Sequence, residues 1–237
     1  MTLRSLAVVA ALLAAGALAA CGGSSNKPSQ ASPGAAVQKT GLYSYATRGA
    51  DRVQAIVSGR HAYPAVTSVS VARQGCDLIE RWTALPERWS EFTSCIQGSR
   101  WRLLSLVDYH EFFGESLEQR YDCHGRFVPR PALIPTGFRW TDRCTSPDSS
   151  ATLEGTALGT KVQKVAGRPV RTVLIRLRAR LRGDVRGTYV IDSWLQRTNG
   201  LLVRREVQSD TVVASAVGTV KGSERYSLRL RSLAPDA

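Results

Sequence analysis

From residue 41 onward the chain alternates apolar and polar side chains, the period of a β-strand. The clearest stretch is 171–182, in which apolar side chains alternate with arginines. Successive side chains of a strand point to opposite faces, so this stretch predicts one apolar and one basic face of a sheet. Similar patterns predict further strands over 42–47, 52–58, 65–73, 188–196, 201–208, 211–220 and 224–233.

Residues 77–96 fit two structures. Their apolar positions recur at spacings of three and four, which is typical of a helix. Pro86 would break that helix in its middle. A hairpin turning near Leu85 and Pro86 would instead place Cys76 opposite Cys95 and Trp82 opposite Trp89. We favour the hairpin.

A second hairpin is predicted between 100–108 and 115–123, with Leu103 opposite Tyr121 and Val107 opposite Leu117. Residues 129–150 contain four prolines and are expected to be irregular. The fold class is therefore mostly β, with antiparallel sheets as a curved half-barrel or two packed β halves, and few or no long helices. The predicted parts are a disulfide-containing half over 41–145 and a basic meander over 151–237, with one continuous domain over 41–237 as the alternative.

The N-terminus has the order of a secretory signal. One cation in residues 2–5 precedes an apolar run from Leu6 to Ala17, which is shorter than the ~18 residues of a membrane span. The following Leu-Ala-Ala-Cys, ending at Cys21, resembles the lipobox of bacterial lipoproteins. That resemblance implies cleavage before Cys21 and attachment of two acyl chains to it.

The predicted organisation is therefore a signal peptide over 1–20 and a lipidated flexible tether over 21–40, which is rich in Gly, Ser, Pro and Ala. Two acyl chains give stable anchoring, whereas one gives only marginal binding. We expect an exported protein, lipid-anchored to the outer, extracytoplasmic face of the cell membrane, with the bilayer as its partner through Cys21.

Four cysteines remain: Cys76, Cys95, Cys123 and Cys144. An even number in an exported chain predicts two disulfides, and four cysteines allow three pairings. We favour Cys76–Cys95 and Cys123–Cys144, although spacing alone leaves the pairing open. The spacing is not that of a zinc site, and we expect no metal and no cofactor.

The charge is strongly basic and unevenly placed. The chain has 32 Lys and Arg against 19 Asp and Glu, a net charge of +13, and residues 151–237 hold sixteen cations against seven acids. Anionic lipids or acidic envelope polymers are the expected partners, and nucleic acid is not, because we expect the protein to be exported. The alternative is a solvated sheet face. Protein partners are not indicated. The candidate patch, expected to face solvent, is Arg176, Arg178, Arg180, Arg229 and Arg231.

The sequence contains no GxSxG, HExxH, Walker A or GxGxxG motif. Ser116, His110 and Asp192 could form a hydrolytic triad only on paper, so we do not expect an enzyme. The favoured function is a non-catalytic binding or structural role in the cell envelope. The alternatives are a lipid carrier and an envelope hydrolase with an unrecognised site.

The carrier alternative comes from a resemblance. The stretch from Trp194 to Arg204, with its Asn199-Gly200 turn, is similar to a hairpin of LolA-like and LppX/LprG-like envelope proteins. The resemblance implies a curved half-barrel that shelters acyl chains. Those families cover their sheet with helices, whereas this pattern predicts almost none. A dry apolar cavity would indicate a carrier, a polar cleft with His and carboxylates an enzyme, and a filled core a scaffold.

Overall fold

The computed structural model describes residues 36–54, 58–112, 115–215 and 218–236. The predicted signal peptide and Cys21 lie outside them. In the described ranges no helix has the length and hydropathy of a membrane span. The strands are β1 (Gly41–Gln54), β2 (Ser58–Ala62), β3 (Val66–Gln74), β4 (Asp77–Leu85), β5 (Arg88–Gln97), β6 (Arg100–Phe112), β7 (Glu115–Cys123), β8 (Val128–Pro129), β9 (Arg139–Thr145), β10 (Ser149–Val165), β11 (Arg168–Gly183), β12 (Val185–Gln196), β13 (Leu202–Ser215) and β14 (Gly218–Leu230).

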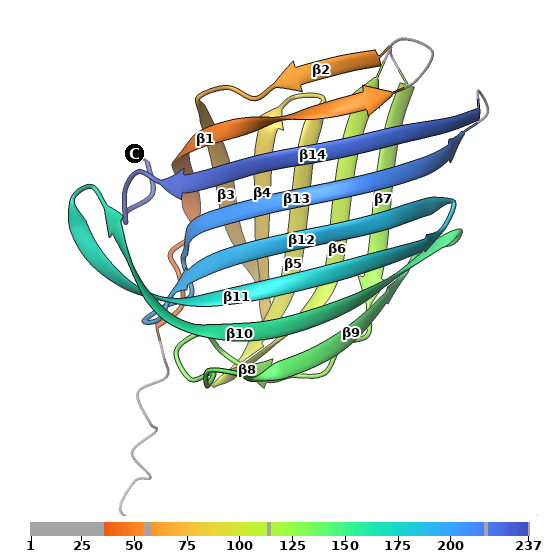
Figure 1. Ribbon diagram of the computed structural model, residues 1–237. Coiled ribbons are helices and arrows are strands. Elements are labelled where there is room, and N and C mark those ends of the chain that lie inside the picture. The colour runs from red at the N-terminus through yellow and green to blue at the C-terminus, as the bar shows by residue number, and fades with distance from the viewer. Residues whose placement is uncertain (1–35, 55–57, 113–114, 216–217, 237) are drawn as a thin grey trace, which may run out of the picture. The chain divides into compact units, whose positions relative to one another are not determined.

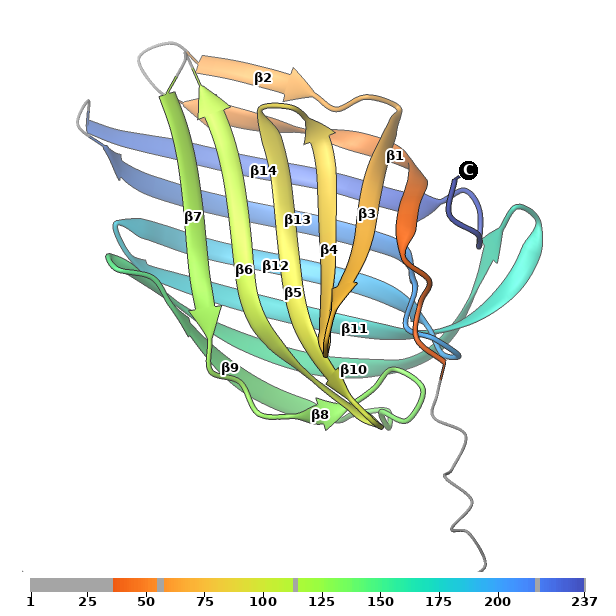
Figure 2. The same ribbon diagram turned by 180° about the vertical axis from the view of Figure 1, so that it is seen from behind.

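The strands form one antiparallel sheet that closes on itself. Neighbours follow the chain from β3 to β7 and from β9 to β14, and β14 pairs with β1 from Tyr45↔Leu230 to Gln54↔Lys221. The ring is a flattened barrel: β10–β14 form one layer, and β3–β7 cross behind them (Figures 1 and 2). The prediction of a mostly β, antiparallel fold without long helices is confirmed, and the sheet goes beyond a half-barrel to full closure.

Closure depends on a close approach at Gly49, in the middle of β1. There β1 changes partner on one edge from β3 to β2 while it keeps β14 on the other. Gly49 has φ +146°, and a Cβ on it would lie 2.3 Å from the Arg225 carbonyl oxygen and 2.5 Å from Cα of Tyr226. Only glycine lets the two backbones meet at this bend.

The strand alternative for 77–96 is correct, since β4 and β5 form a hairpin. Its predicted register is off by one residue along the hairpin, because Cys95 lies opposite Asp77 rather than Cys76. Likewise, Trp82 lies opposite Ser90, and Trp89 opposite Thr83. A bulge between Thr83 and Leu85 shifts the pairing by one further residue next to the turn. Trp82 therefore points into the barrel, while Trp89 lies on the outside.

Two further expectations are corrected by the register. In the hairpin of β6 and β7, Tyr121 lies opposite Leu106 and Leu117 opposite His110, because β6 continues to residue 112 and the turn comes later than expected. His110 is thus a strand residue. The segment 129–150 is not wholly irregular, since it contains β9, which pairs with β10 from Ser150↔Thr145 to Thr156↔Arg139.

Large aromatic side chains fill the part of the barrel enclosed by β1, β3, β4, β13 and β14. Trp82 stacks on Tyr226 with 4.1 Å between ring centroids, and Tyr63 meets Trp82 edge-on at 5.4 Å. Tyr45 donates a hydrogen bond to the Leu202 carbonyl oxygen at 2.6 Å. This packed region supplies much of the apolar burial that stabilises the fold.

The last residues of the predicted tether, 36–40, lie against the barrel. Gln38 is buried, its backbone NH donates to the Asn199 carbonyl oxygen at 3.1 Å, and its side chain donates to Glu80 at 3.1 Å. Arg130 donates to the Ala36 carbonyl oxygen at 2.6 Å. The barrel is therefore joined to the preceding chain by a fixed segment.

Candidate ligand-binding site

Inward-facing side chains away from the aromatic core leave two cavities in the barrel. Cavity 1, of about 120 Å³, lies among β4, β5, β6, β9, β11, β12 and β13. Cavity 2, also of about 120 Å³, is lined by β5, β6, β7 and by β10–β14. Phe92, Leu177 and Ile191 line both. The two spaces are thus adjacent chambers of one barrel interior.

The strand alternation explains why the walls are apolar. On β11 the inward positions Ile175, Leu177 and Ala179 line the cavities, while Arg178 points outward and is exposed. Each chamber approaches the roughly 150 Å³ of an engineered apolar cavity that stays dry and binds benzene. An interior of this size and lining suits a small apolar group or part of an acyl chain.

A buried charge cluster forms one wall of cavity 2. Arg88, at the start of β5, donates from Nε and Nη2 to the two carboxylate oxygens of Glu224 at 3.0 and 2.9 Å. Its Nη1 donates to Asp108 Oδ1 at 2.6 Å. Arg88 and Glu224 are buried, and Asp108 is 25% exposed. One guanidinium thus joins β5, β6 and β14 across the inside of the barrel.

Tyrosines and a histidine complete the cluster. Tyr63 donates to Glu224, and Tyr189 donates to Asp108 Oδ2 at 3.0 Å. His110 Nε2 lies 3.3 Å from the same oxygen. The two carboxylates therefore have donors on several sides, as buried carboxylates require.

The electrostatics of this cluster follow from burial and pairing. Burial alone would raise the pKa of Asp108, but the Arg88 charge and then His110 hold it below its usual range. Burial would lower the pKa of Arg88, but Asp108 and Glu224 keep it well above its usual value. Burial, followed by the Glu224 charge, raises the pKa of Tyr63. The arginine and Asp108 are thus charged at neutral pH.

Cavity 1 has a different polar set. Arg205 of β13 is 5% exposed, and Glu80, Arg130 and Asp142 also line the cavity. Arg130 donates to the carbonyl oxygens of Gly98 and Ala36. Burial lowers the pKa of Arg130, and burial raises the pKa of Asp142. Few polar groups stand in a mainly apolar wall, which is the usual composition of a small-molecule site.

The four predicted disulfide cysteines come together in two pairs. Cys76 joins Cys95 and Cys123 joins Cys144, with Cα atoms 4.8 and 4.0 Å apart. This agrees with the pairing favoured from the sequence. Within the described residues, the one cluster with metal-ligand geometry is Cys76, Asp77 and Cys95, and both of its sulfurs are in the disulfide.

The predicted arginine patch is divided in the structure. Arg178 and Arg180 of β11 are exposed, as are Arg229 of β14 and Arg231 after it. The register places Arg178 in line with Arg225 rather than Arg229, so the two pairs are offset along the strands. They are also three strand spacings apart, about 14 Å. Arg176 is half-buried and bound to Asp192 by two hydrogen bonds of 2.7 and 2.6 Å.

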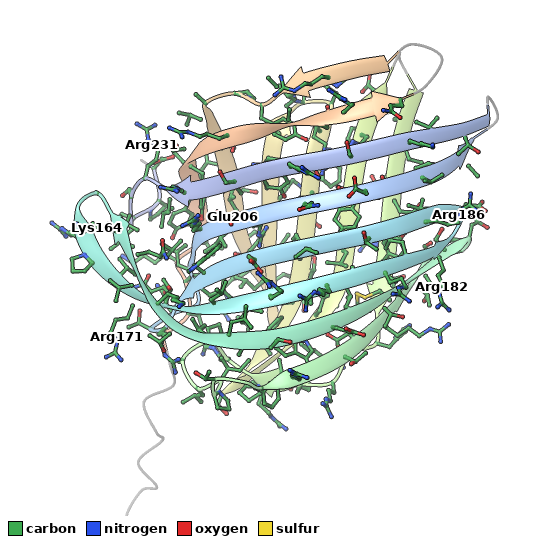
Figure 3. The ribbon with its side chains drawn as sticks, in the orientation of Figure 1. Lys164, Arg171, Arg182, Arg186, Glu206 and Arg231 are labelled. Carbon is green, nitrogen blue, oxygen red and sulfur yellow. A yellow bond between two sulfur atoms is a disulfide. The ribbon has the colours of Figure 1, made fainter. Side chains whose placement is uncertain are left out.

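Other cations surround this face. Figure 3 shows Lys164 at the tip of the projecting β10–β11 hairpin and Arg182 and Arg186 at the opposite end of the strands. Arg231 lies beyond the end of β14. The outward positive charge is therefore spread over the sheet rather than collected in one patch.

The three residues of the hypothetical hydrolytic triad do not come together. Ser116 is exposed on β7 opposite Glu111, on the face away from His110. Asp192 points outward and is held by Arg176. His110 faces cavity 2. No two of them share a site in the described structure.

The sequence analysis missed the charged residues that line the two cavities, among them Arg88, Asp108, Arg205 and Glu224. One signal was available. Three consecutive charged residues, Arg204 to Glu206, lie on a strand, so at least one must face inward. To identify which of the three faces inward, the register of the strand must be known.

Sequence and structure comparisons with known proteins were made for the whole chain. No protein-family model and no curated protein sequence matches it. Among solved structures it is similar to the hypothetical lipoprotein YmcC from Escherichia coli. The identity is 12%, the match covers 79% of this chain and 88% of that one, and the TM-score is 0.34.

Proposed function

We propose that this protein is an exported, lipid-anchored binding protein whose barrel holds a small apolar or amphiphilic molecule. The observation that carries the proposal is the pair of adjacent apolar chambers inside the closed sheet. Unfilled interior space weakens a fold, because the surrounding atoms lose contacts. A bound ligand would restore the contacts that the walls of the two chambers lack, and this would account for the unfilled space.

The lipobox at Cys21 supports the location of the proposed activity. An anchor on the outer face of the membrane would hold the barrel beside a source of apolar molecules. The ligand class agrees with the acyl chains expected from the LolA-like resemblance. The arrangement differs, because a closed barrel would enclose the ligand on all sides.

The test is to fill the chambers. Ser94→Trp adds a large side chain to cavity 1, and Ala179→Phe adds one to cavity 2. Thr93→Trp is the matched control, because Thr93 is the outward neighbour of Ser94 on β5. All variants are made in the full chain carrying Cys21→Ala, so that the preparation needs no detergent to compete for the chambers.

Native mass spectrometry should show a bound molecule on the parent protein, and calorimetry should show binding of octanol after that molecule is removed. The two filling variants together should abolish both signals, while Thr93→Trp leaves them unchanged. Overpacking costs about 1–3 kcal/mol, so melting curves check that the variants stay folded. A parent protein that carries no ligand and takes up no octanol would contradict the proposal.

A further inference from the structure

Arg205 is a buried cation inside the barrel. It points inward from β13 opposite Ser193 on one side and Leu228 on the other, and it is 5% exposed. Its guanidinium lies over the Phe92 ring at 4.7 Å, and its Nε donates a long hydrogen bond of 3.4 Å to Ser193 Oγ. These contacts hold the flat group in place at the wall of cavity 1.

Its remaining donors have no acceptor in the described structure. A guanidinium has five N–H groups, and only Nε is used here. Among the described residues, no carboxylate lies close enough to Arg205 to form an ion pair, for which the limit is 4.0 Å. The contrast is Arg88, whose guanidinium reaches both Glu224 and Asp108. Burying a cation without a counter-charge is costly, which makes Arg205 an exception that calls for an anion.

The acids of cavity 1 do not supply this anion. Glu80 accepts a hydrogen bond from Gln38 at 3.1 Å, and the carboxylate of Asp142 lies against Gly125. Neither forms an ion pair with Arg205. A second cation, Arg130, lines the same chamber. The cavity therefore has room, apolar walls and a fixed guanidinium whose Nη groups are not used by the protein.

We propose that Arg205 binds the anionic head of a single-chain amphiphile whose chain lies in the two chambers. The planar fork of arginine suits a carboxylate or phosphate, to which it donates two parallel hydrogen bonds. Arg205 stands at the junction of the chambers: Phe92, on which it stacks, lines both, and Val207, the next inward residue of β13, lines cavity 2. A head at this position leaves apolar space on either side for the chain.

This inference rests on the proposed function, and the probes separate the two. Octanol, octanoate and octyl phosphate share one chain and differ in their heads. Calorimetry with each probe is carried out on the full chain carrying Cys21→Ala, alone and with Arg205→Met, Arg205→Lys or Arg178→Met added. Arg178→Met removes an exposed outward arginine and is the matched control for lost charge.

At least one anionic probe should bind the parent about tenfold or more tighter than octanol, since hydrogen bonds to charged groups contribute about 1.5–3 kcal/mol. Arg205→Met should remove this preference without weakening octanol, which also shows that the variant is folded. Arg205→Lys should retain part of it, and Arg178→Met all of it. The anion that binds more tightly identifies the head as carboxylate or phosphate.

Two results would overturn the inference alone. One is equal affinity of the parent for octanol and both anions, and the other is an unchanged preference in Arg205→Met. If Arg205→Met does not fold, Arg205→Lys decides. A preference for the anionic probe over octanol equal to that of the parent overturns the inference, and a reduced preference supports it. Failure of octanol as well as both anions to bind would instead contradict the proposed function.

Discussion

The charge cluster around Arg88 shows how single residues are constrained inside this barrel. One cation faces two carboxylates, and each carboxylate has a tyrosine donor as well. A buried ion pair is weak evidence for net stability, but removing one member leaves the others buried without compensation. Arg88 is the one member that binds both carboxylates, so its loss should have the largest effect.

Arg88→Met should destabilise the protein by about 3–5 kcal/mol at pH 7. The pH dependence should also change. In the parent the pKa of Asp108 is lowered on folding, so its contribution is present at neutral pH and is lost as the pH falls through and below the ordinary Asp value of about 3.9. Without Arg88, burial raises that pKa, and protonation then favours the folded state. Urea unfolding at pH 7, 5 and 4 should show the gap between variant and parent shrinking as the pH falls.

The control is Arg178→Met, which removes an exposed arginine and should change stability by less than about 0.5 kcal/mol. A gap between Arg88→Met and the parent that stays constant or widens on acidification would show that Arg88 does not set the ionisation of Asp108.

At this scale the sequence predicted the outward arginines, because alternation on β11 is strict. It could not predict Arg88 or Arg205 as inward, because bulges in β4 and β6 and the shift between β12 and β13 decide the phase of neighbouring strands.

Among the elements, the junction of β7 and β9 is the weakest seam of the ring. The two strands pair at only two positions, Asp122↔Thr145 and Cys123↔Cys144. Gln119 adds one side-chain hydrogen bond to Ser146 at 2.9 Å. The Cys123–Cys144 disulfide lies at this short ladder and covalently closes the barrel where few backbone bonds do so. Cys76–Cys95 instead joins strands that already pair along a whole hairpin.

Replacing Cys123 and Cys144 together by serine should therefore cost more than replacing Cys76 and Cys95. A disulfide typically contributes about 2–4 kcal/mol, and loop lengths are similar here, with sequence separations of 21 and 19. The difference should come from the folded state. Hydrogen exchange should show faster opening of β7 and β9 in the first pair of substitutions and little change outside β4 and β5 in the second. Equal losses and equal exchange patterns would show that the seam is held by something else.

The elements themselves were largely predictable, and their closure was not. Hairpins such as β12–β13 follow from local signals, here the alternation on either side of Asn199-Gly200. The β1–β14 pairing joins residues far apart in the sequence, from Tyr45↔Leu230 to Gln54↔Lys221, and no local pattern marks it. Gly49, whose missing side chain permits the close approach to Tyr226, lies in the gap between the strands predicted over 42–47 and 52–58, whereas the structure has one continuous strand there. The cavities could not be predicted either, because they exist only once the ring is closed.

For the whole molecule, the lipid anchor and the outward charge predict separable contributions to membrane binding. Cys21→Ala should move the full chain from the membrane pellet to the supernatant, because two acyl chains supply the stable attachment. The unanchored chain should still co-sediment weakly with anionic vesicles at low salt, each cation near the surface contributing about 1 kcal/mol within a Debye length of ~8 Å at physiological salt. Replacing Arg178, Arg180, Arg229 and Arg231 by glutamine should lower that binding more than the same change at Lys161, Lys164, Arg168 and Arg171 on the projecting hairpin if the sheet face is the contact. Equal loss from the two sets would assign the attraction to net charge, and equal binding to neutral and anionic vesicles would leave the sheet arginines as a solvated face.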